Sequence, residues 1–153
     1  VYFYNSTSYS GKKKLAGYRA AMEEKKLLTG ANLLQFYHGS HEDIPAMTEH
    51  LKKLHDKGLQ FHGIIAADDN LALAAVKYAK LMKYSIPEEF TILGYNNSML
   101  VNCCDPELTS IDNKLETLCQ HLITTLMGVL SGNEMPKKTI FSGEIIKRGT
   151  TKF

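Results

Sequence analysis

The sequence lacks the features that mark membrane, secreted or zinc-binding proteins. No apolar run is long enough to cross a bilayer and there is no signal peptide, so we expect a cytoplasmic protein without a membrane partner. Its three cysteines, an odd number that includes a vicinal pair, do not form a disulfide framework, and no spacing resembles a zinc site. No methionine opens the chain, and we expect its 153 residues to be part of a longer protein.

Catalytic signatures and a strong net charge are also missing. There is no G-x-S-x-G elbow, no glycine-rich dinucleotide loop and no activated Cys–His pair, so we expect no enzyme and no cofactor. A net charge of +2 gives no broad electrostatic footprint for nucleic acid. Repeats, low-complexity tracts and a dividing linker are absent, and 44% hydrophobic residues suffice for one domain with a real core.

What the chain does contain is an alternation of short apolar runs and helical periods. Such alternation with short connections predicts an α/β fold, a doubly wound parallel sheet with helices on both faces. The expected strands are residues 1–5, 32–37, 63–67, 90–94, 108–111, 139–141 and 144–147. The expected helices are residues 13–27, 44–57, 71–83 and 115–130.

Polar residues follow the expected strands. The segments are "NSTSYSGKKK", "YHGSHED", "ADDN", "GYNNS" and "IDNKL", whereas the opposite strand ends are plainer. Ligands of open parallel sheets bind beyond the carboxyl ends of the strands. Neutral and acidic hydrogen-bonding groups gathered at that edge suit a polyhydroxy ligand.

Two adjacent carboxylates stand between the third strand and the third helix. We expect Asp69 to cap the helix by accepting a backbone N–H of its first turn. Asp68 is then left at the strand tip, where it either contacts a ligand or remains a second solvated aspartate near the helix dipole.

Other polar residues at this edge have two interpretations each. Lys12, Lys13 and Lys14 crowd a helix start, as solvated side chains or as a cationic site for ligand oxygens, and we expect two of them to be solvated. Asn96 makes a turn or binds ligand hydroxyls. His41, in a strand-end loop, is a further candidate contact, and no histidine has a convincing metal-ligand spacing.

Several ordered motifs resemble the effector-binding domain of the lactose/galactose-repressor family of bacterial transcription regulators. They are "LAGYRAAM", the acidic pair followed by "LALAA", "IPEEFTILGYNN", "PELTSI" and "IKRGTT", and together they extend over residues 1–151. The resemblance implies a periplasmic-binding-protein-like fold, incomplete here, in which an effector lies between two subdomains. It also implies operator DNA as a partner, bound through a helix-turn-helix head that this chain lacks.

The resemblance further implies an organisation and a set of effector contacts. Residues 1–112 correspond to the second subdomain, 113–140 to a crossover helix and strand of the first, and 141–153 to a return segment. The implied contacts are Lys14, Asp68, Asn96, Asn113 and Leu115. Asn96 stands where the family usually has Asp, and Lys14 where it usually has an effector-binding Arg, which makes the two-pronged contact that lysine lacks.

We therefore expect a sensor module that binds a sugar or sugar derivative, including a phosphorylated one, and controls the DNA affinity of its parent protein. The helix of residues 115–130 is apolar on more than one side, which fits core burial or a homodimer interface. Two alternatives remain: a receiver-like or enzymatic domain that uses Asp68 and Asp69, and a sugar-binding protein of a transporter.

Overall fold

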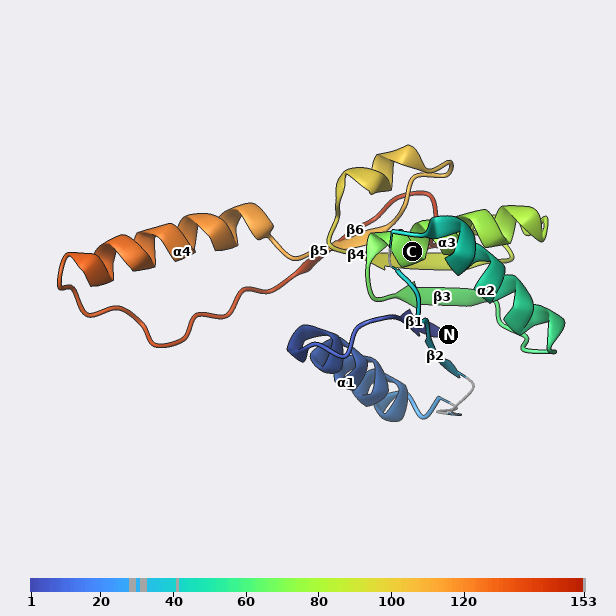
Figure 1. The fold of residues 1–153 in the computed structure, drawn as a ribbon, viewed down its shortest axis with the longest axis horizontal. Coiled ribbons are helices and arrows are strands. Elements are labelled where there is room, and N and C mark those ends of the chain that lie inside the picture. The colour runs from blue at the N-terminus through green and yellow to red at the C-terminus, as the bar shows by residue number, and fades with distance from the viewer. Residues whose placement is uncertain (28–29, 31–32, 41, 153) are drawn as a thin grey trace.

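Six strands form one sheet in the order β2-β1-β3-β4-β5-β6 (Figure 1). The computed structural model describes residues 1–27, 30, 33–40 and 42–152. The strands are β1 (Tyr2–Tyr4), β2 (Leu34–Phe36), β3 (Gly63–Ala66), β4 (Thr91–Tyr95), β5 (Ser110–Asp112) and β6 (Glu144–Ile146). β1 to β5 pair in parallel, whereas β6 runs antiparallel to β5. The expected doubly wound α/β fold is confirmed, with one antiparallel edge.

Helices cover both faces of this sheet. α1 (Tyr9–Glu24) lies on one face, and α2 (Ile44–Asp56) and α3 (Asp69–Leu81) lie on the other. The chain also has α4 (Leu115–Leu130), which does not cover the sheet (Figure 1), and a 3₁₀ helix η2 (Met99–Cys103). On one face Tyr2 of β1 stacks on Tyr18 of α1, with ring centroids 5.0 Å apart. The next residue, Phe3, points to the opposite face and stacks at 6.0 Å on His50 of α2, as alternation along a strand requires. No helix among the described residues is long and apolar enough to span a membrane.

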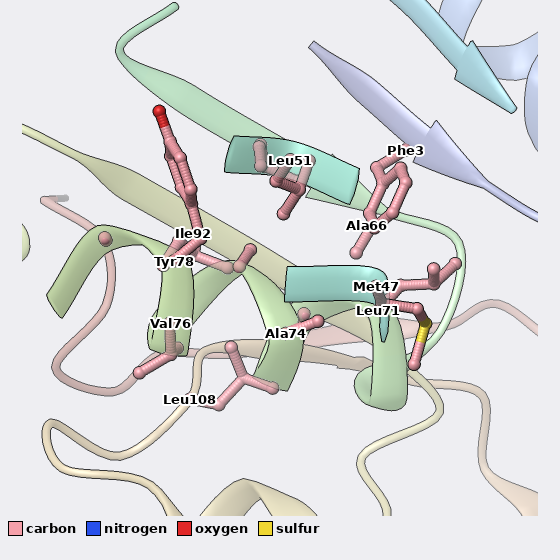
Figure 2. Close-up of a cluster of buried hydrophobic side chains, with 14 of the residues drawn as sticks. Phe3, Met47, Leu51, Ala66, Leu71, Ala74, Val76, Tyr78, Ile92 and Leu108 are labelled. Carbon is pink, nitrogen blue, oxygen red and sulfur yellow. The ribbon is translucent and has the colours of Figure 1, made fainter. Parts of the chain in front are cut away.

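The main core lies between the sheet and the helices α2 and α3 (Figure 2). Its fully buried side chains come from β1, α2, α3 and β4 and include Phe3, Met47, Leu51, Leu71, Tyr78 and Ile92. Burial of each such side chain contributes roughly 1.5–3 kcal/mol. This core fixes α3 against β3 and β4 and so determines where the segments after those strands lie.

The start of α1 differs from the expectation. The helix begins at Tyr9 instead of residue 13, because Ser8 caps it: its Oγ accepts a hydrogen bond from the Gly11 N–H at 3.1 Å. The sequence "STSYS" contains four residues of types that cap helices, and only the tertiary structure shows that Ser8 is the one used. The lysines therefore lie beyond the first residues of the helix.

The expected strand of residues 139–141 is wrong. These residues form no strand; they run back beside α4, where Thr139 Oγ1 and His121 Nε2 are 3.0 Å apart. The ring of Phe141 meets the ring of His121 edge-on at 5.3 Å. With no neighbouring strand here, an apolar triplet has nothing with which to form a ladder.

Helix α4 and the segment after it form an arm that extends away from the sheet (Figure 1). The predicted bounds of this helix are confirmed, but none of its residues is buried. Its large exposed apolar side chains are Leu115, Leu122, Ile123, Leu126, Met127, Val129 and Leu130. An apolar surface of this size is typical of an element that packs against further protein.

The chain after β6 returns to the sheet and joins β4 to β5. The Ile92 N–H donates to the carbonyl of Thr150 at 2.8 Å, and Thr150 Oγ1 donates to the carbonyl of Ile92 at 2.7 Å. The same hydroxyl accepts the Thr109 N–H at 2.9 Å. A buried threonine thus completes the sheet where β4 and β5 are not paired directly.

Candidate functional site

The segments that follow β3, β4 and β5 meet at one edge of the sheet. The parallel pairing brings the residues after Ala66, Tyr95 and Asp112 to the same side. From there, Asn113 Nδ2 donates to Asn96 Oδ1 at 3.4 Å. The expectation that polar residues gather at the carboxyl ends of the strands is confirmed.

Two hollows adjoin at Asn96, and we call them together the strand-end crevice. The first, of about 240 Å³, is lined by Asp68, Asp69, Asn70, Asn96, Ser98, Met99 and Leu100. The second, of about 770 Å³, is lined by residues 96–99 and 112–117. Asp68, Asn96, Asn113 and Leu115 therefore all border the crevice, and Leu115 does so as the first residue of α4.

Two buried polar atoms at the crevice have no hydrogen-bond partner among the described residues. They are Ser98 Oγ and Asn113 Oδ1. Because a buried polar group without a partner costs free energy, such atoms indicate places where a ligand or water completes the bonding. A hydroxyl and an amide oxygen suit a partner that both donates and accepts, as a hydroxyl group does.

The assignment of the helix cap to Asp69 is wrong. Asp68 is the N-cap of α3, with extended backbone (φ −152°, ψ 172°), and its Oδ1 accepts the Leu71 N–H at 2.9 Å. Asp68 still borders the crevice, so the cap uses one carboxylate oxygen of a residue that also lines the hollow. The same residue, Asp68, therefore both caps the helix and lines the crevice.

Asp69 instead points into the molecule and is only 2% exposed. Its Oδ1 accepts the hydroxyl of Ser110 at 2.6 Å, and its Oδ2 accepts the Ser98 N–H at 2.7 Å. It also lies in the first turn of α3, where the helix dipole favours an anion. The two adjacent aspartates thus have different partners, and Asp69 holds the segment after β4 against β5.

From α1, Lys14 reaches the ends of β3 and β4, next to residues that line the crevice, although it lines neither hollow itself. Its Nζ donates to the carbonyl of Ala67 at 2.8 Å and lies 3.7 Å from the centroid of the Tyr95 ring. Burial lowers the pKa of Lys14, and the nearby carboxylates of Asp68 and Asp69 oppose that shift. Lys14 is therefore a half-buried cation beside two acids.

The other two lysines of the cluster are solvent-exposed, as expected for two of the three. Lys13 lies over the ring of Tyr9 at 5.6 Å, on the outer side of α1. The predicted cationic helix start is thus reduced to one lysine, Lys14.

The residues after β4 adopt left-handed backbone conformations. Asn96 has φ 107° and Asn97 has φ 50°, values that asparagine tolerates better than most residues. The Asn96 N–H donates to the carbonyl of Ile111 at 2.9 Å, which anchors the turn to β5. The turn-making role expected of Asn96 is confirmed, and Asn96 also places its side chain at the crevice.

Sequence reasoning missed several residues around the crevice. Tyr95 holds Lys14, Ser98 contributes an unpartnered hydroxyl, and Ser110 and Arg148 bind the turn after β4. Ser110 and Arg148 lie within "PELTSI" and "IKRGTT", so the motifs pointed to the right segments. The side chains of a motif that face the turn are decided by the residue at which each strand ends, and the sequence does not predict that residue.

Metal and thiol chemistry find no support in the described part of the chain. No group of three or more His, Cys, Asp or Glu side chains there could hold a metal ion. Burial raises the pKa of the Cys104 thiol, which disfavours the reactive thiolate. The candidate contact His41 lies outside the described residues.

The crevice and the sheet define a class of protein, the periplasmic binding protein-like domains. The sequence model of that domain family matches residues 1–151. An HTH-type transcriptional regulator of Lachnoclostridium phytofermentans is 46% identical over all 153 residues of this chain, which match 45% of its length. The HTH-type transcriptional regulator AscG of Escherichia coli is 24% identical over 89% of this chain and 40% of that protein.

Solved structures share the fold. The sugar-binding transcriptional regulator of the LacI family from Escherichia coli, complexed with phosphate, aligns with a TM-score of 0.85 at 22% identity, over 98% of this chain and 53% of that one. The lac repressor dimer bound to operator aligns with a TM-score of 0.86 at 18% identity, over 99% of this chain and 51% of that one.

The chain belongs to the periplasmic binding protein-like domain family, and its resemblance to the lactose/galactose-repressor (LacI) family of transcription regulators is confirmed. It spans less than half the length of the curated relatives named above. Those relatives are transcription regulators, not enzymes.

Proposed function

We propose that this chain is the effector-sensing part of a bacterial transcription regulator. It binds a sugar or sugar derivative in the strand-end crevice and controls how tightly its parent protein holds operator DNA. The observation that carries the proposal is the meeting of Lys14, Asp68, Asn96 and Asn113 at one edge of the sheet, with unpartnered polar atoms among them.

The chemistry of the crevice supports a ligand rich in hydroxyl groups. Asp68 offers acceptors, while Asn96 and Asn113 each offer both donors and acceptors, which match the dual character of a hydroxyl. Lys14 adds one positive charge at the edge, so a phosphorylated sugar belongs to the proposed class. One structure with the same fold is a complex with phosphate, and another, that of the regulator CelR, is a complex with cellobiose.

The exposed apolar arm supports the division of the chain into parts. We assign residues 1–112 to one subdomain, 113–140 to a crossover helix and strand of a second subdomain, and 141–153 to a return segment. In this proposal the apolar surface of α4 packs against the remainder of the second subdomain, outside these 153 residues. We further propose that the parent protein is a homodimer located in the cytoplasm.

The receiver-like alternative needs two carboxylates that face the same metal ion or phosphoryl group. Asp69 is buried, and both of its carboxylate oxygens accept hydrogen bonds, from Ser98 and Ser110. These oxygens are therefore already hydrogen-bonded within the protein, and the arrangement does not favour a receiver-like domain. The alternative of a transporter binding protein would also need a ligand crevice, but the curated relatives, which are transcription regulators, favour a regulator.

The test is an amide NMR titration of the chain with cellobiose, glucose, glucose 6-phosphate and inorganic phosphate. With half of the implied cleft, we expect dissociation constants on the order of millimolar. The shifts should cluster at Lys14, Asp68, Asn96 and Asn113. The matched control pair is Asn96→Ala, which should weaken binding, and Asn102→Ala at an exposed position of η2, which should not.

Shifts elsewhere on the surface, or equal effects of the two asparagine variants, would contradict the assignment of the crevice. Regulation is tested in a protein that joins this chain to a DNA-binding head. A sugar that binds the crevice should change its affinity for operator DNA, and the Asn96→Ala variant should lose that response.

A further inference from the structure

The turn after β4 is held by side chains from three separate parts of the chain. Asp69 at the start of α3 accepts the Ser98 N–H at 2.7 Å and the hydroxyl of Ser110 at 2.6 Å. Ser110 Oγ in β5 also accepts the Asn97 N–H at 3.1 Å. Arg148, after β6, donates from its guanidinium to Asn97 Oδ1 at 2.9 Å. We call these four bonds the turn network.

The centre of the turn network is buried, so its groups depend on one another for hydrogen bonds. Asp69 is 2% exposed and Ser110 is fully buried. The Asp69 carboxylate accepts hydrogen bonds from a hydroxyl and a backbone amide, lies in the first turn of α3 and has Lys14 nearby, so its charge is favoured where it lies. An apolar side chain in place of either buried residue of the network would leave the Ser98 or the Asn97 N–H without its acceptor, so the loss would fall on the turn itself.

What the network does is hold an unfavourable backbone geometry. Asn96 and Asn97 are consecutive residues with positive φ, a conformation that persists only where surrounding contacts determine it. The N–H groups of Asn97 and Ser98 donate to the network, while Asn96 turns its side chain to the crevice, where its Oδ1 accepts a hydrogen bond from Asn113. The bonds are thus made to the two residues that follow the candidate ligand contact.

We infer that Asp69 is a positioning residue of the crevice, which acts through Ser110 and the turn of residues 96–98 to aim Asn96 at the effector. This inference rests on the proposed function, in which Asn96 contacts the effector. Asp69 does not touch the effector in this arrangement; its carboxylate sets where the amide of Asn96 lies.

The same network connects the crevice to the arm. Ser110 opens β5, which leads out to α4, and Arg148 lies on the segment that returns from it. Arg148 also donates to the carbonyl of Leu108 at 3.0 Å, so it joins both sides of that connection.

The first test needs no ligand and follows amide hydrogen exchange in Asp69→Ala and Asp69→Asn. The matched control is Asp43→Ala, because Asp43 is also a carboxylate at a helix start, accepting the Ala46 N–H at 3.0 Å. In Asp69→Ala we expect exchange at Asn97 and Ser98 to rise about tenfold or more, with core amides unchanged. Asp69→Asn keeps an acceptor for the Ser98 N–H and should show a smaller rise. If Asp69→Ala does not fold, exchange in Asp69→Asn is measured in its place.

Two outcomes of the exchange test overturn the inference. One is unchanged exchange at Asn97 and Ser98; the other is a uniform rise across the chain, which shows that Asp69 supports the fold in general. The Asp43→Ala control should raise exchange only in the first turn of α2.

The second test is a double-mutant cycle with cellobiose or glucose 6-phosphate, whichever binds the unmodified chain. Asp69→Asn and Asn96→Ala should each weaken binding, and the double variant should bind no more weakly than Asn96→Ala alone. Additive losses overturn the inference. If neither probe binds the unmodified chain, the proposed ligand class fails, while the exchange test still decides whether Asp69 positions the turn.

Discussion

The ammonium group of Lys14 lies 3.7 Å from the centre of the Tyr95 ring and donates 2.8 Å away to the carbonyl of Ala67. This places a cation from α1 over the last residue of β4 and against the end of β3. The charge is thereby held at the ends of these strands, near Asp68, while Lys12 and Lys13 remain in solvent. Its position leads to the first prediction.

Lys14→Ala should weaken binding of glucose 6-phosphate more than binding of glucose. The phosphate loses a nearby cation, whereas the uncharged sugar keeps its contacts with Asp68 and Asn96. NMR titrations of both ligands measure the ratio of the two affinities. Lys12→Ala, an exposed lysine of the same helix, is the control and should leave the ratio as it is. An unchanged ratio in Lys14→Ala would remove phosphorylated sugars from the proposed class.

Gly94→Ala should destabilise the protein, by about 1–3 kcal/mol. A methyl group at this position meets the carboxylate of Asp69 and lies 3.0 Å from Cδ2 of Leu108, inside the packed junction of α3, β4 and β5. Urea unfolding followed by circular dichroism measures the loss. The control is Gly17→Ala in α1, where no atom lies within 4 Å of the added methyl group and helix propensity predicts a gain of about 0.5–1 kcal/mol. Equal effects of the two variants would show that Gly94 is not tightly packed.

Thr150→Val should cost about 1–3 kcal/mol of the free energy of unfolding, because it leaves the buried Thr109 N–H without its acceptor. The shape of the side chain is nearly unchanged, so the loss reports the hydroxyl. Thr117→Val on the exposed surface of α4 is the control and should change stability little. A loss in Thr150→Val that does not exceed the control would mean that the return segment is not required to join β4 and β5.

The stability of the protein should fall as the pH rises above 10. Burial raises the pKa of Tyr78 to about 12 from its usual 10.0, and burial does the same for Tyr2. Folding therefore favours the protonated phenol: its contribution is complete below pH 10 and is lost as the pH approaches 12, by up to about 1.4 kcal/mol per pH unit for each tyrosine.

Unfolding measured between pH 9 and pH 11 tests this, together with the absorbance of tyrosinate. Tyr2 and Tyr78 should ionise late, and burial also raises the pKa of Tyr18, so the remaining five of the eight tyrosines should ionise first. Tyr78→Phe should remove one of the late phenols and reduce the slope. A flat stability profile across this range would contradict the burial of both phenols.

Local patterns determined much of this protein. The apolar period of residues 115–130 predicted the bounds of α4, and the alternation of strands and helices predicted the sheet. The polar strand ends predicted where the crevice lies. These features depend on residues near one another in the chain, so the sequence carries them directly.

The roles of single residues depended on tertiary structure. Asp68 took over the cap predicted for Asp69 and kept its place at the crevice, while Asp69 turned into the core. The reason is that β3 ends at Ala66 and the helix begins at Asp69, so a difference of one residue decides which carboxylate is buried. The hydrogen bond between Arg148 and Asn97 joins residues 51 positions apart, and that between Thr150 and Ile92 joins residues 58 positions apart. No local sequence pattern predicts either bond. Local propensity and period determined the elements, whereas the packing of distant segments decided which side chains form the crevice and which ones hold it in place.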